Sequence, residues 1–326
     1  MLDNIKNRLR AQFEGLDAWF FPHPALWGLL ALFAVIQLIW QANSGLHFDY
    51  GTSWKANLFA CWLLFLGVRF QARSPVIGAI SFTFAFMLLI GPVLRTLTYL
   101  GTAAGFPLID PWIARFDQMV GFDWVAHVAW VNSYPSVVFL LDYIYMSIVG
   151  AMLGALAILL VMGRFDRIRE LVILNSTLTL LGVLFCTFLP AIGAYAWYAP
   201  DALLISNIPE TAGRYHLEHF TSLRDGSLTS IETSKTIGII TFPSFHTVVP
   251  VLLVWSLRQT PWFWPGLPLG LIMVASTLSI GGHHLGDVMA SFVLCAVAVA
   301  LYHKYLGLSL PNKIKLSPQP MQSLGS

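Results

Sequence analysis

The most constraining feature of this chain is a series of long apolar runs separated by short polar breaks. About 20 predominantly apolar residues in helical conformation cross the roughly 30 Å hydrocarbon core of a bilayer. The run at 242–257 is short and carries Pro250, which predicts that its outer end lies inside the protein. We expect an all-α, polytopic membrane helical bundle of about eight spans, at residues 24–40, 54–69, 75–94, 135–162, 171–191, 242–257, 262–280 and 284–302.

The composition excludes an ordinary soluble domain. Of the 326 residues 57% are hydrophobic and only 10% are charged, whereas soluble domains carry roughly 25% charged residues. A net charge of +2 gives no indication of nucleic-acid binding. Cys61, Cys186 and Cys295 all fall inside apolar runs, so we expect buried thiols rather than a disulfide framework or a metal site.

Lysine and arginine residues are distributed unequally between the two sides of the expected bundle. Basic clusters precede the first span, follow the eighth, and occupy the loops after the second, fourth and sixth spans. Because cytoplasmic loops carry an excess of Lys and Arg, we expect a plasma (inner) membrane protein with both termini in the cytoplasm. The long loops after the third and fifth spans then face outward, and aromatic residues near the span ends predict interfacial belts.

Three parts of the chain are expected. Residues 1–23 read as a cytoplasmic amphipathic segment, residues 24–306 as one membrane-embedded domain, and residues 307–326 as a disordered cytoplasmic tail. Within the domain, the aromatic stretch 109–130 is interrupted by Asp110, Arg115, Asp117 and Asp123. We interpret this stretch as an interfacial or re-entrant helix over the outer face.

Ionisable side chains gather in two segments, TFPSFHT at 241–247 and GGHHLGD at 281–287, each where an outer loop turns into a span. Such groups are costly at a membrane and are therefore functional candidates. Ser244 suits a helix cap, so His246 would project from the first turn, beside backbone amides that favour an anion. His283 and Asp287 are four residues apart and would share one helix face.

This pattern suits phosphoryl transfer. A carboxylate that holds one imidazole nitrogen leaves the other as a basic lone pair. One imidazole can then attack phosphorus to form a phosphohistidine, while a second, protonated imidazole gives its proton to the leaving alkoxide. We expect His283 to be the nucleophile, Asp287 to orient it, and His246 to be the acid.

The two segments resemble a known family. PSFHT at 243–247 resembles the Pro-Ser-x-His second motif of the type 2 phosphatidic acid phosphatase superfamily, and GGHHLGDV at 281–288 resembles its third motif, with one span between them. The resemblance covers about residues 75–305. It implies a six-helix phosphatase-like core within 24–306, a lipid phosphate or phospholipid substrate, hydrolase or phosphotransferase activity, and no metal or organic cofactor.

The family's third motif usually has an Arg six residues before its His, and here that residue is Thr277. The first motif is not visible either, and such losses are similar to the branch that includes inositol phosphorylceramide synthase. LPAIGAY at 189–195 and LRDG at 223–226 also look similar to that branch. Some other cation must then hold the phosphate. Our first candidate is Arg224, an outer-loop residue, with Lys235 and Arg214 behind it.

Two further polar residues are candidates for binding the substrate. Ser244 is either a phosphate ligand or only a helix cap. Asp142, in the outer half of the fourth span, either orders a catalytic His or binds a substrate hydroxyl, or else makes a plain interhelical hydrogen bond.

Other interpretations stay open. His246, His283 and Asp287 could form a structural polar cluster, and His283, His284 and Asp287 are of metal-ligand type. His216 and His219 invite a zinc interpretation, although histidines on a polar loop are more often solvated. A lipid transporter would spread polar residues along several spans, whereas here they gather at one depth. Whether the acceptor is water or an alcohol, and the oligomeric state, are not determined.

Overall fold

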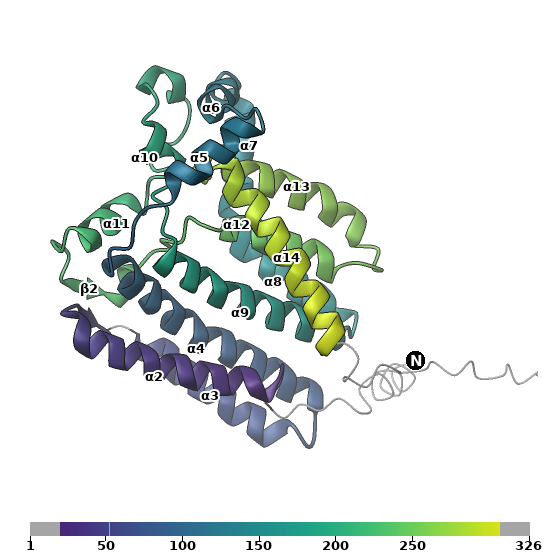
Figure 1. Ribbon diagram of the computed structural model, residues 1–326. Coiled ribbons are helices and arrows are strands. Elements are labelled where there is room, and N and C mark those ends of the chain that lie inside the picture. Colours follow the sequence, from purple (N-terminus) through teal and green to yellow (C-terminus); the bar gives the residue numbers. More distant parts are fainter. Residues whose placement is uncertain (1–19, 52, 307–326) are drawn as a thin grey trace, which may run out of the picture.

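A computed structural model describes residues 20–51 and 53–306. The described chain is built almost entirely of helices (Figure 1). Two three-residue strands, β1 (His47–Asp49) and β2 (Ser230–Glu232), pair in parallel. The larger helices are α2 (Pro24–Ser44), α3 (Trp54–Phe70), α4 (Pro75–Ala103), α7 (Pro135–Met146), α8 (Ile148–Val161), α9 (Phe165–Phe188), α12 (Phe245–Ser256), α13 (Phe263–Ser279) and α14 (Leu285–Tyr305).

Every predicted span contains a helix, and the prediction of an all-α membrane bundle is confirmed. Among the described helices, α2, α4, α9 and α14 are long and apolar enough to cross a bilayer on their own. Helices α8, α12 and α13 are apolar but shorter. Helix α6 (Trp124–Asn132) and α7 together pass the same test as a pair bent by 108°, which is the geometry of a broken span or a re-entrant loop.

The predicted span over 135–162 consists of two helices, because the chain breaks at Ser147 between α7 and α8. The Ser147 hydroxyl donates to the carbonyl of Ile144 at 2.7 Å. A hydroxyl that bonds to the preceding turn competes with the helical backbone pattern.

The helices form layers (Figure 1). Helices α2 and α3 pack on α4, α4 packs on α9, and α9 in turn contacts α8, α12 and α14. The main core lies where these helices meet and includes the buried residues Phe82, Leu171 and Leu252. Short elements cover one end of the bundle: α5 (Asp110–Met119), α6, α10 (Ala194–Tyr198), η1 (Ala202–Ile205), α11 (Leu217–Arg224) and η2 (Thr233–Lys235).

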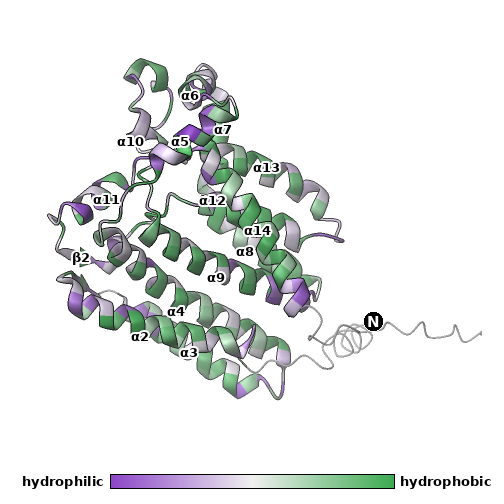
Figure 2. Cartoon of the chain, viewed as in Figure 1, coloured by the Kyte–Doolittle hydropathy of each residue, from purple (hydrophilic) through white to green (hydrophobic). Residues whose placement is uncertain are grey.

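Three helices connect the two ends of the bundle. Helix α9 runs toward the end covered by the short elements, whereas α12 and α14 begin there. At 1.5 Å per residue α14 is about 31 Å long, close to the thickness of a hydrocarbon core. Figure 2 shows α9 and α14 as largely hydrophobic, with hydrophilic residues gathered at α5 and at the far end of α14. Polar chemistry is therefore concentrated at the ends of these helices.

The structure confirms some of the other expectations from the sequence and contradicts others. The stretch 109–130 forms two short helices, α5 and α6, rather than one. Cys186 and Cys295 are buried as expected, but Cys61 is exposed on α3, so that part of the prediction is wrong. Apolar runs show only that a residue can lie in a membrane helix and do not tell a lipid-facing side from a protein-facing one. Almost all of the amphipathic segment and all of the tail lie outside the described residues.

Candidate active site

The two predicted motifs lie at the starts of neighbouring helices. Ser244 is the N-cap of α12 and His284 is the N-cap of α14. The Ser244 N–H donates to the Asp287 carbonyl at 3.4 Å, and the Ser291 hydroxyl donates to the Ser244 carbonyl at 3.0 Å. The motif that carries His246 and the motif that carries His283 are therefore joined through backbone groups.

His283 and Asp287 make the predicted contact. The Nδ1 atom of His283 lies 3.2 Å from Oδ2 of Asp287, and both residues are buried. The same oxygen accepts the backbone N–H of His284 at 3.0 Å, whereas Oδ1 of Asp287 has no partner in the described chain. A carboxylate on Nδ1 fixes the tautomer and leaves Nε2 of His283 as the nucleophilic lone pair.

The loop that carries His283 is held by its backbone. The His283 N–H donates to the Thr277 carbonyl at 3.0 Å, and the indole N–H of Trp124 donates to the His283 carbonyl at 3.0 Å. The Tyr195 hydroxyl donates to the Ser279 carbonyl at 2.6 Å. Trp124 and Tyr195 are buried, so these two aromatic residues support the site instead of joining an interfacial belt.

Two glycines allow another loop to approach this one. Gly282 and Gly213 have φ angles of +67° and +60°. A Cβ atom on Gly213 would lie 2.7 Å from the Cα of Gly282. Only glycine combines this backbone conformation with so close an approach. The contact brings the loop segment around residue 213 next to the loop that carries His283.

His246 stacks on an aromatic ring. Its imidazole lies 4.2 Å from the Tyr145 ring at an interplanar angle of 14°, and its Nδ1 is 3.3 Å from the Tyr145 hydroxyl. His246 is the second residue of α12, whose N-cap Ser244 bonds to Asp287 in the motif that carries His283. The sequence highlighted Asp142 on this helix, but Tyr145, one turn later, is the residue that contacts the histidine.

His284 is the residue whose surroundings the sequence did not anticipate. Its ring is completely buried, with Nε2 3.5 Å from Asp110 Oδ1 and Nδ1 3.4 Å from Asp117 Oδ2. Burial alone would lower the pKa of His284, but the two carboxylates outweigh it and raise that pKa to about 9. His284 is therefore an imidazolium at neutral pH, held between two buried acids.

The same two acids also bind backbone amides. Asp110 accepts the N–H groups of Ile192 and Gly193 at 2.9 and 3.0 Å. Asp117 accepts the N–H groups of Leu285 and Gly286, at the start of α14, at 3.1 and 2.8 Å. The signal that could have found them is their spacing of seven, which places both acids on one face of a helix.

Of the two helices that begin at the motifs, α12 is the one whose first backbone amides are available to a ligand. The start of a helix favours an anion. At α14 that position is taken by Asp117. Within the described part of the chain, the backbone N–H groups of Phe245 and His246 have no hydrogen-bond partner. Ser244 is completely buried, and its Oγ accepts from the Thr247 hydroxyl at 3.1 Å, which leaves its own proton to donate.

The three candidate cations lie in different surroundings. Arg214 follows Gly213, lies 5.0 Å from the Tyr195 ring centre, and has a buried Nε without a hydrogen-bond partner. Arg224 donates to the Phe106 carbonyl at 2.9 Å, and no described contact joins it to His283 or His246. Lys235 is exposed and forms an ion pair with Glu232 at 2.7 Å. Arg214 is thus the candidate whose contacts reach the His283 loop.

The remaining candidates lie apart from one another. Asp142 is half-buried on α7 and has no described hydrogen bond. His219 contacts the Tyr99 hydroxyl at 2.6 Å, whereas Nε2 of His216 lies 3.0 Å from the Ile192 carbonyl. Burial lowers the pKa of His216 to about 4, so this residue is neutral at physiological pH. His216 and His219 therefore have separate partners, and no group of three His, Cys, Asp or Glu side chains with a geometry that could hold a metal ion occurs among the described residues.

Comparison with known proteins identifies a matching protein family. The family model of the PAP2 superfamily matches residues 111–301, more than half of the chain, including both motifs. No curated protein and no solved structure shows a significant match. Membership supports a phosphatase-type enzyme in general, and the apolar helices fit a multi-pass membrane protein. The chain belongs to the PAP2 superfamily.

Proposed function

We propose that this protein is an integral membrane phosphatase or phosphotransferase that acts on a lipid phosphate or phospholipid through a phosphohistidine. The observation that carries the proposal is the contact between His283 Nδ1 and Asp287, with His246 on the adjoining helix start. An imidazole oriented by a carboxylate, beside a second imidazole, provides a nucleophile and an acid–base group.

The reaction has two steps. Nε2 of His283 attacks phosphorus while the bond from phosphorus to the leaving oxygen breaks, and His246 gives that oxygen a proton. His246 then takes a proton from water or an alcohol, whose oxygen attacks the phosphohistidine and breaks the P–N bond. The alcohol part of the substrate leaves in the first step. A lipid phosphate then gives inorganic phosphate with water or a new phosphomonoester with an alcohol, whereas a phosphodiester gives a phosphomonoester with water or a new phosphodiester with an alcohol, and both histidines return to their starting states.

The negative charge of the phosphoryl group needs several donors. The free amides at the start of α12 and the Ser244 hydroxyl can serve as neutral donors. The geometry favours Arg214 as the cation, because it follows the Gly213–Gly282 contact and lies against Tyr195, which bonds to the His283 loop. Both Arg214 and Arg224 have a buried N–H without a partner in the described chain, so that feature does not separate them. Arg224, the first choice from sequence, and Lys235 stay as rival proposals.

We place the active site on the outer face, which is the periplasmic face in a Gram-negative host. The support is the Lys/Arg asymmetry of the short loops. In a cysteine-free background, a cysteine introduced near Arg224 should react with an impermeant thiol reagent in intact or outer-permeabilised cells. One introduced near Arg167, for example at the exposed Asp166, should react only after lysis. The reverse pattern would move the site to the cytoplasmic face.

A transferase that uses an alcohol, as in the inositol phosphorylceramide synthase branch, is the second candidate within this chemistry. The LPAIGAY segment supports it, because Asp110 holds the amides of Ile192 and Gly193 in that segment beside the histidine cluster. The non-enzyme candidate is a lipid transporter.

One assay of the purified chain separates these functions. Lipid phosphates and phosphodiesters labelled with ³²P are incubated with and without alcohol acceptors, and free phosphate and new phospholipid are counted separately. We expect turnover of at least one substrate, and labelled protein that is acid-labile and base-stable, as a phosphohistidine is. The label should be absent from His283→Ala and accumulate in His246→Ala when a good leaving group is used. No turnover and no label on the whole panel would contradict the enzyme and favour the transporter.

A further inference from the structure

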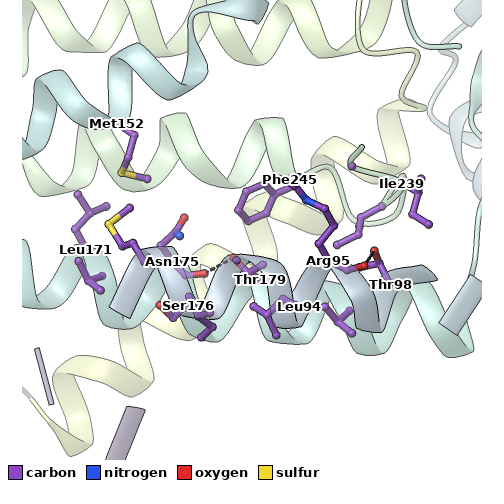
Figure 3. A pocket seen from close by; sticks show the side chains of 17 residues that line it. Leu94, Arg95, Thr98, Met152, Leu171, Asn175, Ser176, Thr179, Ile239 and Phe245 are labelled. Atoms are coloured by element: carbon purple, nitrogen blue, oxygen red, sulfur yellow. Dashed lines mark hydrogen bonds between the residues drawn. The ribbon is translucent and has the colours of Figure 1, made fainter. Parts of the chain in front are cut away.

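A cavity of about 330 Å³ lies outside the catalytic cluster, between α4 and α9 on one side and α8 and α12 on the other (Figure 3). Its volume is in the range of ligand pockets. Its walls are mostly apolar, with Met152 from α8 and Leu94 from α4 among them. Asn175, Ser176 and Thr179 form a short polar stripe on α9.

The cavity runs along α9. Its lining on α9 extends from Leu171 to Val183, which at 1.5 Å per residue is about 18 Å. Half of a roughly 30 Å hydrocarbon core is about 15 Å, so the cavity has the length of one leaflet's acyl chains. Gly91 and Arg95 line it from α4 and are exposed, which opens the cavity to the surroundings of the bundle.

One end of the cavity adjoins the catalytic residues. Phe245 lines the cavity, and the next residue, His246, belongs to the histidine cluster. Arg95 lies near this end, close to Phe245 and Ile239 (Figure 3). Its Nη1 donates to the Thr236 carbonyl at 3.1 Å, and it is the single charged side chain among the described lining residues. The cavity is thus apolar along its length and cationic beside the active site.

We infer that this cavity binds an acyl chain of the anionic lipid substrate, with Arg95 near the headgroup end and the chain lying along α9 between α4 and α8. The inference deepens the proposed function and rests on it. Apolar walls suit a hydrocarbon chain, the single cation suits an anionic lipid, and the adjoining histidines place the phosphate ester at the point of reaction.

Two glycines allow a matched test. A Cβ atom at Gly91 or at Gly154 would meet no atom within 4 Å, and both residues are exposed on apolar helices. Gly91 lines the cavity, whereas Gly154 does not. Gly91→Trp should therefore fill the cavity, and Gly154→Trp should control for a bulky residue in a membrane helix.

Purified variants are assayed on dioleoyl phosphatidic acid and on p-nitrophenyl phosphate, which has no acyl chain. We expect Gly91→Trp to lower kcat/KM for the lipid by roughly tenfold or more, by analogy with the cost of misfitting several methylenes, and to keep the soluble substrate within about twofold. Gly154→Trp should change neither. Equal losses on both substrates, or no loss on the lipid, would overturn the inference.

A binding measurement separates failure of the cavity from failure of the proposed function. The catalytically inactive His283→Ala variant in nanodiscs is irradiated with phosphatidic acid that carries a diazirine in its acyl chain. Crosslinks should map to α9 between residues 171 and 183 and should disappear in the Gly91→Trp/His283→Ala double variant. Crosslinks confined to exposed residues such as Phe59 on α3 would overturn the inference even if the enzyme is active. Crosslinks in the cavity, together with a wild-type protein that shows neither phosphatase nor phosphotransferase activity on the whole panel, would uphold the cavity as a lipid site and refute the proposed chemistry.

Discussion

Two buried polar clusters stand at opposite ends of α9, α12 and α14. At one end Glu170, which is 3% exposed, accepts hydrogen bonds from Trp255, Arg167 and Arg258 at 2.7 to 3.3 Å, and His303 approaches it at 3.0 Å. At the other end Asp287 uses one carboxylate oxygen, and its second oxygen has no partner in the described chain.

The comparison separates a structural cluster from a reactive one. Buried polar atoms are normally satisfied, because an unpaired one costs about 1–3 kcal/mol. Both oxygens of Glu170 have donors, which fits a role in holding α9, α12 and α14 together. The incompletely paired carboxylate, that of Asp287, lies at the end with the family motifs, whereas in the Glu170 cluster Nε of Arg167, and not a carboxylate oxygen, lacks a hydrogen bond in the described chain. Composition alone cannot tell the clusters apart, since each combines acids, cations and histidine.

The largest expected effect is on catalysis at the motif end. His283→Ala and His246→Ala should each lower turnover by at least about a thousandfold, because they remove the nucleophile and the acid of one reaction. The check is turnover of purified, folded protein on the best substrate. His303→Ala, which removes a histidine from the Glu170 cluster, is the matched control and should keep activity. Near-normal turnover of either motif variant would refute the mechanism.

The next effect is on stability at the other end. Glu170→Ala leaves Arg167 and Arg258 without their carboxylate, and breaking such a buried pair costs about 3–5 kcal/mol. Unfolding in detergent should show this loss, while turnover per folded molecule stays unchanged. Asp166→Ala is the control, because its carboxylate is 56% exposed and such a pair contributes about 0–1 kcal/mol. Equal destabilisation by both variants would mean that the buried Glu170 cluster contributes no more to stability than an exposed ion pair.

A smaller effect on turnover should show which cation holds the phosphate. Arg214→Ala should lower turnover about a hundredfold, the usual cost of removing one donor to developing charge. Arg214→Lys should recover only part of it, since an ammonium cannot grip two phosphate oxygens. Arg224→Ala and Lys235→Ala, assayed in parallel, should stay within several-fold of the wild type. If Arg224→Ala is the most damaging variant, the phosphate lies nearer α11 than we propose.

A still smaller effect is on the pH dependence of stability. The folded-state pKa of His284 is about 9, above the ordinary value of 6.5, so the folded protein binds more protons than the unfolded chain between these values. This stabilisation is fully present below pH 6.5 and is lost as the pH rises through 9. The melting temperature in detergent should therefore fall between pH 7 and 10, and much less so in His284→Gln. Parallel curves for the two proteins would contradict the assignment.

The last prediction is that removing metal ions has no effect on turnover. EDTA should leave turnover unchanged, because the proposed chemistry uses two imidazoles and no metal. The check compares activity with and without chelator before and after adding zinc or magnesium. Inhibition that either ion reverses would favour a metal site that includes His283 and His284.

Local patterns predicted much of this protein. Apolar runs located every large helix, and a spacing of four placed His283 against Asp287, because both features depend on neighbouring residues. The contacts of His284 with Asp110 and Asp117 join segments about 170 residues apart, which no local spacing encodes. The approach of Arg214 to the motif depends on a contact between two loops, so the sequence ranked it behind Arg224. The roles of these residues stay predictions.

The backbone bonds through Ser244 bear on how substrates are chosen. The starts of α12 and α14 are tied together by one main-chain bond, from Ser244 to Asp287, and by the short Ser291 side chain, which donates to the Ser244 carbonyl. On the proposed mechanism these bonds would fix the spacing between the imidazoles of His246 and His283, so that the site would not have to close around its substrate. An enzyme of this kind would select its substrates by the width of the group that must fit between the two imidazoles. Increasing the spacing between the imidazoles by the width of one atom, rather than changing a charge, would be the direct way to alter the substrate preference.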